Sequence, residues 1–273
     1  MSRLAARFAA LKAAGRSAFI PFITAGDPTS TITETLLRAL PALGADIIEL
    51  GLPFSDPMAD GPAIQSSSLR ALRGGMNLSK TLDLVTSFRR HDMQTPLVLM
   101  GYYNPIHAYG VARFVADAAT AGVDGLITVD LPPEEDAGLR TAALARGIDV
   151  VRLATPTSDE IRLRTITADA SGFLYYVSVA GVTGTKEVAE GDVRAAIARL
   201  RKASQLPVAV GFGIKNAEQA ARIARLADAV VVGSAIVTRI GAAHDDGRMG
   251  ETLPAHILEF CRDLADAVHG ARG

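Results

Sequence analysis

The sequence alternates short apolar runs with amphipathic segments over its whole length, and this alternation restricts the fold more than any other feature. The amphipathic segments carry apolar residues at helical spacing, whereas the runs are rich in β-branched residues and continuously apolar. Strands of that kind are covered on both faces, which indicates a parallel sheet with helices around it. The runs, about eight in number, are residues 18–24, 46–51, 97–101, 125–129, 149–153, 173–178, 208–211 and 229–233.

The predicted fold class is α/β, a single closed (β/α)8 TIM barrel. About eight strand and helix units in a chain of 273 residues are what such a barrel needs. An open, doubly wound parallel sheet is the alternative, because periodicity does not show whether a sheet closes. No linker rich in proline or serine divides the sequence, so residues 1–273 are expected to form one domain.

Two further features extend the predicted barrel. Residues 2–15 are basic and amphipathic, which predicts an extra N-terminal helix that stops at Gly15 and covers one end of the fold. Organelle transit peptides carry a similar pattern. Long connections are expected after strands two, six and eight, at residues 52–77, 179–192 and 238–249. Long connections in a compact domain are usually functional.

Composition narrows the class of ligand and the cellular compartment. The formal net charge is -1, whereas binding to nucleic acid or to a membrane surface needs a basic field, so the expected ligand is a small molecule. No apolar run approaches the roughly 18 residues of a membrane-spanning helix. The only cysteine, Cys261, cannot build a disulfide framework, and this suits a reducing cytoplasm.

A carboxylate inside an apolar strand is the strongest sign of chemistry. Glu49 lies within the second run, where an unpaired charge would cost several kcal/mol. The turn-rich loop that follows contains Asp60. Barrel enzymes build their sites at the C-terminal ends of the strands, so the loop can bring both carboxylates into one pocket. Two carboxylates in different environments can divide the roles of acid and base.

Glycine turns follow the last three strands, at residues 181–184, 211–214 and 232–235. Glycine lets a backbone approach an anion closely, and a helix that starts after Gly233 and Ser234 would direct free N–H groups toward it. Barrels of this type often bind phosphate at these strand ends. The turns therefore predict a phosphate site.

Two kinds of aldol chemistry lack their usual residues. A Schiff-base aldolase needs a lysine at a strand end, and each lysine of this sequence falls in an expected helix or loop. A metal aldolase needs clustered ligands, and the histidines are scattered without ligand spacing, so no metal site is predicted.

Several long motifs, in order along the chain, resemble the tryptophan synthase alpha subunit family. The resemblance extends from end to end. The motifs are residues 19–28 (FIPFITAGDP), 47–62, 101–105 (GYYNP), 130–135 (DLPPEE), 181–184 (GVTG), 211–213 (GFG) and 233–234 (GS).

The resemblance implies a (β/α)8 barrel that acts as a carbon-carbon lyase in tryptophan biosynthesis. Such a subunit cleaves indole-3-glycerol phosphate to indole and glyceraldehyde 3-phosphate by acid/base retro-aldol chemistry. It carries no cofactor of its own. Its expected partner is a beta subunit with pyridoxal phosphate, in a heterotetramer of two alpha and two beta subunits.

The resemblance also assigns roles to single residues. Glu49 would be the general acid at C3 of the indole and then the base for the side-chain hydroxyl. Asp60 would hydrogen-bond the ring N–H and stabilise its developing positive charge. Tyr175 either assists proton transfer and positioning or only forms part of the wall. The residues expected to touch the substrate are Phe22, Met100, Ile127 and Phe212 at the indole, Gly184, Gly213, Gly233 and Ser234 at the phosphate, and Thr183 in a lid at residues 179–190.

Two alternatives share these residues. The chain can be a stand-alone lyase that releases free indole, or a catalytically silent subunit that only activates the beta enzyme. The pair Glu49 and Asp60 argues against a silent subunit. Val179 and Lys215 depart from residues that are frequent in the family, an arginine and a small polar residue, which leaves lid closure and the surroundings of the phosphate open.

Overall fold

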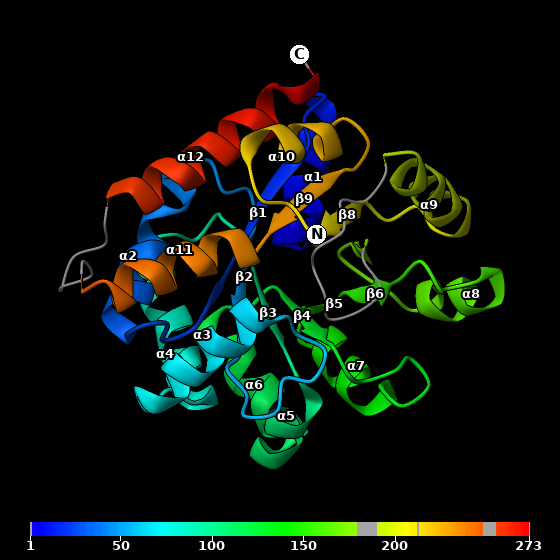
Figure 1. The fold of residues 1–273 in the computed structure, drawn as a ribbon. Helices are drawn as coiled ribbons and strands as arrows, with labels where there is room; N and C mark the ends of the chain where they lie inside the picture. Colours follow the sequence, from blue (N-terminus) through cyan, green and yellow to red (C-terminus); the bar gives the residue numbers. More distant parts are fainter. Residues whose placement is uncertain (1, 179–189, 212, 248–254, 273) are drawn as a thin grey trace.

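The computed structural model describes residues 2–178, 190–211, 213–247 and 255–272 (Figure 1). Within this part of the chain, nine strand segments form one parallel sheet, with helices arranged around it. The strands are β1 (Ala18–Thr24), β2 (Ile48–Gly51), β3 (Leu97–Gly101), β4 (Gly125–Thr128), β5 (Asp149–Val150), β6 (Arg152–Ala154), β7 (Leu174–Val177), β8 (Val208–Gly211) and β9 (Ala229–Val232).

The sheet closes into a barrel at the chain segment that contains β5 and β6. β1 pairs with β2 on one side and with β9 on the other, and the order continues in both directions as far as β5 and β6. These two segments are one stretch of chain, interrupted at Val151. β5 pairs with β4, and β6 pairs with β7. The nine segments therefore occupy the eight positions of a barrel, which confirms the predicted (β/α)8 fold over the open sheet.

Helices follow the strands along the chain. They are α1 (Arg3–Ala13), α2 (Ser30–Ala39), α3 (Pro62–Arg73), α4 (Leu78–Arg89), α5 (Tyr103–Tyr109), α6 (Val111–Ala121), α7 (Ala137–Leu144), α8 (Glu160–Ala168), α9 (Glu190–Ala203), α10 (Ala217–Ala224), α11 (Ser234–Asp245) and α12 (Ala255–His269), with 3-10 turns at Pro41–Leu43 and Gly270–Arg272. Among the described residues, none of these helices has the length and apolar character required to cross a bilayer.

Alternate residues of each strand face the barrel interior and the helices. In β1, Ile20 and Phe22 belong to the interior cluster, whereas Phe19 and Ile23 belong to the layer beneath the helices. This period of two is the side-chain geometry of a strand, and it explains why the runs are apolar throughout. Glu49 follows the same rule, since its neighbours in β2 face the helices, and its carboxylate therefore faces the interior.

The expected N-terminal helix is confirmed as α1. The Ser2 hydroxyl caps it by accepting from the N–H of Ala5, and the apolar face, which includes Phe8, packs in the interior cluster. The rings of Phe8 and Phe173 are 5.7 Å apart, between centroids. Ser2 also donates to Asp149 at 2.6 Å. Because Phe173 and Asp149 stand where their strands begin, α1 covers the N-terminal end of the barrel.

Two of the long connections contain more helical structure than the sequence pattern predicted. The connection after β2 includes α3, whose serine-rich sequence resembled a loop. Ser67 and Ser68 are buried, whereas Ser66 is exposed, and the Ser67 hydroxyl lies 2.7 Å from that of Thr24. The helix expected after Gly233 and Ser234 is present as α11, and it continues to Asp245, into the expected connection. Glycine at residue 241 leaves room for Arg70, since a Cβ there would lie 3.0 Å from the guanidinium. The expected lid at residues 179–190 lies outside the described residues except for Glu190, where α9 begins.

Candidate active site

Glu49 is a carboxyl group buried inside the barrel. It lies in β2 between Phe22 of β1 and Val98 of β3, and its side chain faces the barrel interior. The residue is 1% exposed, and its Oε2 atom accepts no hydrogen bond within the described part of the chain. Burial, and then the charge of Asp60, raise the pKa of Glu49 to about 8. Glu49 is therefore protonated at neutral pH and can donate a proton.

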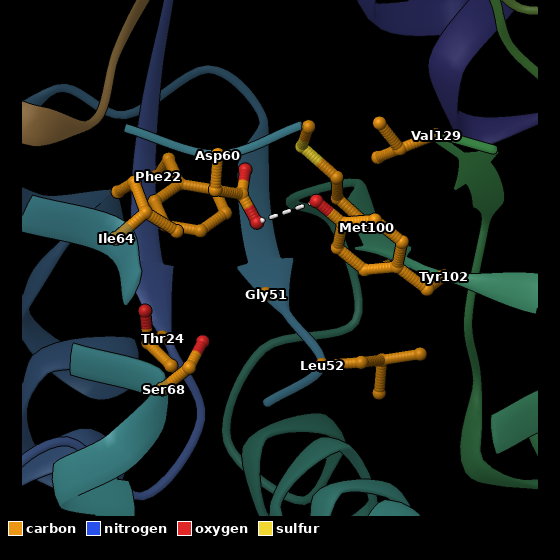
Figure 2. A pocket seen from close by; sticks show the side chains of 11 residues that line it. Phe22, Thr24, Gly51, Leu52, Asp60, Ile64, Ser68, Met100, Tyr102 and Val129 are labelled. Carbon is orange, nitrogen blue, oxygen red and sulfur yellow. Dashed lines mark hydrogen bonds between the residues drawn. The ribbon is translucent and has the colours of Figure 1, made fainter. Parts of the chain in front are cut away.

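Asp60 enters the same site from the loop between β2 and α3. Figure 2 shows its carboxylate and the hydroxyl of Tyr102 directed toward each other, and Tyr102 donates to Oδ2 at 3.1 Å. The Gln65 amide donates to the backbone carbonyl of Asp60 at 2.8 Å. Burial raises the pKa of Asp60 to about 6, against the lowering effect of the Tyr102 hydrogen bond. At neutral pH this carboxylate is mostly ionised, in contrast to Glu49.

Tyr175 completes the group from the opposite side of the barrel. It lies in β7, is 3% exposed and belongs to the interior cluster. Burial, followed by the charges of Glu49 and Asp60, raises its pKa well above the ordinary value for tyrosine. The fold thus brings the three predicted catalytic residues together and keeps the phenol protonated.

A pocket opens beside these residues at the C-terminal ends of the first strands. Glycines give it room, since a Cβ at residue 51 would lie 2.5 Å from the ring of Phe22 and one at residue 101 would lie 2.8 Å from Leu52. The lining residues are Phe22, Thr24, Gly51, Leu52, Asp60, Ile64, Ser68, Met100, Gly101, Tyr102 and Val129 (Figure 2). Its wall is largely apolar and suits an aromatic ring.

The pocket includes two of the predicted indole contacts and omits another. Phe22 and Met100 line it, as predicted. Ile127 belongs to the same interior cluster but does not line the pocket, whereas Val129 does. Val129 lies two residues after Ile127 and therefore on the same face of the chain. The two-residue period of β4 could have predicted Val129 as a lining residue. Tyr102 directly follows β3, the position at which barrel strands present functional side chains.

The described glycines that follow β8 and β9 lie at the same end of the barrel. Ser234 is the exposed first residue of α11, and Gly233 precedes it as the N-cap without a side-chain hydrogen bond. A Cβ at residue 233 would lie 3.2 Å from that of Phe22, so this helix starts beside the pocket. Gly213 has a φ of 80°, which favours glycine. The N-terminus of α11 presents free N–H groups and a positive dipole end to an anion.

The remaining predicted contacts, Thr183, Gly184 and Phe212, lie outside the described residues. Val179 lies outside them as well, while Lys215 is exposed. Across residues 2–178, 190–211, 213–247 and 255–272, no three histidine, cysteine or acidic side chains are grouped so that they could hold a metal ion.

Known proteins resemble this chain over almost its full length. A family model described as tryptophan synthase alpha chain matches residues 8–269. The structure is similar to tryptophan synthase subunit alpha from Legionella pneumophila str. Paris, with 38% identity, a TM-score of 0.90 and coverage of 98% of each chain. It is also similar to a chain of Mycobacterium tuberculosis tryptophan synthase, with 35% identity, a TM-score of 0.88 and coverage of 98% of each chain. This chain belongs to the tryptophan synthase alpha chain family.

Proposed function

We propose that this chain cleaves indole-3-glycerol phosphate to indole and glyceraldehyde 3-phosphate, with Glu49 and Asp60 as its catalytic carboxyl groups. Membership of the family supports the lyase activity and the place in tryptophan biosynthesis. The observation that carries the assignment of residues is the pair of carboxyl groups in one barrel, one with a pKa of about 8 and the other of about 6. Such a pair is suited to acid/base chemistry near neutral pH.

In the first step, Glu49 gives its proton to C3 of the indole ring. The ring then carries a positive charge that extends to its nitrogen, and this iminium is the electron sink for the cleavage. The Asp60 carboxylate accepts a hydrogen bond from the ring N–H and stabilises the developing charge. Because the ring serves as the sink, this proposal needs no Schiff base.

In the second step, Glu49 acts as a base. Its carboxylate takes the proton from the hydroxyl group on the side-chain carbon attached to C3, and that oxygen becomes the carbonyl of glyceraldehyde 3-phosphate. The bond between C3 and this carbon breaks, and its electron pair returns to the ring to give neutral indole. Glu49 ends the cycle protonated, as it began. Tyr175 contributes to positioning or proton transfer beside it.

The substrate lies across the mouth of the barrel in this proposal. The indole contacts assigned in this proposal are Phe22, Met100, Ile127 and Phe212. The phosphate binds at the turns that contain Gly184, Gly213, Gly233 and Ser234, where α11 supplies N–H groups and its dipole. Thr183 closes over the substrate as part of the lid.

Family membership supports a partnership with a tryptophan synthase beta subunit. The assembly we propose contains two alpha and two beta subunits, with pyridoxal phosphate in the beta subunit and no cofactor in this chain. The cytoplasmic location expected from the single cysteine belongs to the same proposal.

Indole release from indole-3-glycerol phosphate tests the function directly. The purified chain is assayed alone and then with a separately purified beta subunit. We expect slow release by the chain alone and a strong rise with the partner. Fast release that the partner does not change would indicate a stand-alone lyase. No release in either condition, together with normal activation of the beta enzyme, would identify a silent subunit.

A further inference from the structure

Tyr102 holds the loop that carries Asp60 at two points. It follows β3, is 3% exposed and lines the pocket. Its ring packs against that of Phe54, with 5.3 Å between the centroids, and its hydroxyl oxygen accepts from the N–H of Ala59 at 3.0 Å. Both contacts are made with residues of the connection between β2 and α3. The tyrosine therefore ties this loop to the neighbouring strand.

The hydrogen bonds of Tyr102 fix the direction of its phenol proton. A tyrosine hydroxyl has one proton to donate. Because the N–H of Ala59 must donate, the phenol oxygen is the acceptor in that bond. The single proton is then available for Asp60, whose Oδ2 atom lies 3.1 Å away. This network of a backbone amide, a phenol and a carboxylate is satisfied with the carboxylate ionised.

Tyr102 leaves one oxygen of Asp60 available for a ligand. Among the described residues, its hydroxyl supplies the only hydrogen bond to the Asp60 side chain, and this bond goes to Oδ2. The rest of the pocket wall near Asp60 is apolar, with Phe22, Ile64 and Met100. The Oδ1 atom therefore remains free to accept from a donor in the pocket.

We propose that Tyr102 is a positioning residue for the lyase reaction, which fixes the Asp60 carboxylate so that Oδ1 meets the indole N–H. This inference depends on the proposed function. A carboxylate on a loop rotates freely unless a partner holds it, and small errors of placement reduce turnover strongly. Tyr102 provides that partner from the end of a rigid strand.

Removal of the Tyr102 hydroxyl would change the ionisation of Asp60, whose charge also acts on the groups around it. Besides burial, the charge of Asp60 raises the pKa values of Glu49 in β2 and of Tyr175 in β7. Besides burial, the charge of Asp130, after β4, raises the pKa of Tyr102. The Tyr102 hydrogen bond lowers the pKa of Asp60, whereas burial raises it. Loss of the phenol hydroxyl would therefore raise this pKa further. Positioning and ionisation of Asp60 then change together.

The test compares Tyr102→Phe with Tyr109→Phe. The control removes a bond of the same type, from the Tyr109 hydroxyl to Asp117 at 2.7 Å, on the surface of α5. We expect kcat for indole release to fall about 10-fold or more in Tyr102→Phe, with a KM within a few-fold of wild type. The acid limb of the kcat/KM profile should also move to higher pH, because Asp60 must be ionised. Tyr109→Phe should leave both unchanged.

A double variant distinguishes positioning of Asp60 from a general structural effect. In an Asp60→Asn background, Tyr102→Phe should reduce kcat no further, because the group that it positions is already changed. Thermal unfolding of each variant checks the fold. An equal loss in both backgrounds, or a kcat and acid limb like those of Tyr109→Phe, would overturn the inference. Absence of indole release by the wild-type chain would instead overturn the proposed function.

Discussion

The hydroxyl oxygen of Tyr175 lies 2.2 Å from the position that a Cβ atom at residue 211 would occupy. Real Cβ atoms do not make so short a contact. The Tyr175 side chain in β7 can therefore take its position only because residue 211, at the end of β8, is glycine. The two residues are neighbours across the sheet, where Tyr175 pairs with Ala209 and Val177 pairs with Gly211. The absence of a side chain at residue 211 thus determines where a phenol of the site can lie.

Gly211→Ala should therefore displace the Tyr175 hydroxyl and lower kcat for indole release by about 10-fold to 100-fold. Gly138→Ala is the matched control, because a Cβ at residue 138 of α7 meets nothing within 4 Å. Steady-state kinetics of both variants provide the measurement. Equal kcat values for the two would show that the position of Tyr175 does not matter for turnover.

Glu49→Gln should abolish acid catalysis while keeping the shape of the side chain. We expect kcat to fall by at least about 100-fold, the lower range for a general acid/base. Glu218→Gln, on the exposed surface of α10, is the control. A turnover near that of the control would remove Glu49 from its proposed role.

The same variant should change how stability depends on pH. The pKa of Glu49 is raised from 4.5 to about 8 in the folded chain, so between these values the unfolded state loses a proton that the native state keeps. The free energy of unfolding of the wild type should then fall by about 1.4 kcal/mol per pH unit from this group. Glu49→Gln lacks this titration and should gain stability relative to wild type as the pH rises. Urea unfolding from pH 4.5 to 8 measures the difference, and a constant difference would contradict the burial argument.

The kcat/KM of the wild type should follow a bell-shaped pH profile, because this ratio reports the ionisation of the ligand-free chain. The acid limb is expected near pH 6, where Asp60 must ionise, and the basic limb near pH 8, where Glu49 must keep its proton. Asp60→Asn should lower kcat about 100-fold and eliminate the acid limb. If the acid limb persists in this variant, another group causes it.

Ser234→Asp should weaken binding of the substrate phosphate. A carboxylate at the first residue of α11 would repel the phosphate and occupy the helix N-terminus, and we expect KM to rise by roughly 10-fold or more. Ser30→Asp adds the same charge at the exposed first residue of α2 and serves as the control. Equal KM values in the two variants would show that the phosphate does not bind at the N-terminus of α11.

Asp124→Asn should destabilise the fold away from the pocket. Asp124 accepts from Arg89 at 2.5 Å, from Arg3 at 2.7 Å and from the N–H of Leu97 at 2.8 Å. Because Arg89 is itself buried, loss of its partner should cost about 3 to 5 kcal/mol in urea unfolding. Asp117→Asn, in an exposed ion pair with Arg113, should cost at most about 1 kcal/mol. Similar losses in both would contradict the role of burial.

Repetition along the sequence predicted the barrel well. β1, β3 and β8 have the bounds that the apolar runs indicated, because the side chains on both of their faces are buried. Helix α3 and the continuation of α11 beyond residue 237 escaped prediction for a physical reason. Serines in one and a glycine in the other look like loop residues until the tertiary contacts of Ser67 with Thr24 and of Gly241 with Arg70 are known.

One part of the candidate site was predictable because a local conflict marked it. Glu49 stood out because a carboxylate contradicts an apolar strand. Tyr102 gave no such signal, since a tyrosine at a strand end suits a wall as well as a hydrogen bond. Its role depends on a loop that returns to it from residues 54–60, and no sequence period reports that contact.

The closure of the barrel depends on the segment from Asp149 to Ala154, whose first half pairs with β4 and whose second half pairs with β7. Side chains alternate along a strand, so the loss of one residue here would turn the inward face of one half outward. The two halves could then no longer pair with β4 and β7 in the registers that close the sheet. The alternating sequence pattern permits both a closed barrel and an open sheet. What separates the two folds in this chain is the register of one strand, which pairs with both β4 and β7.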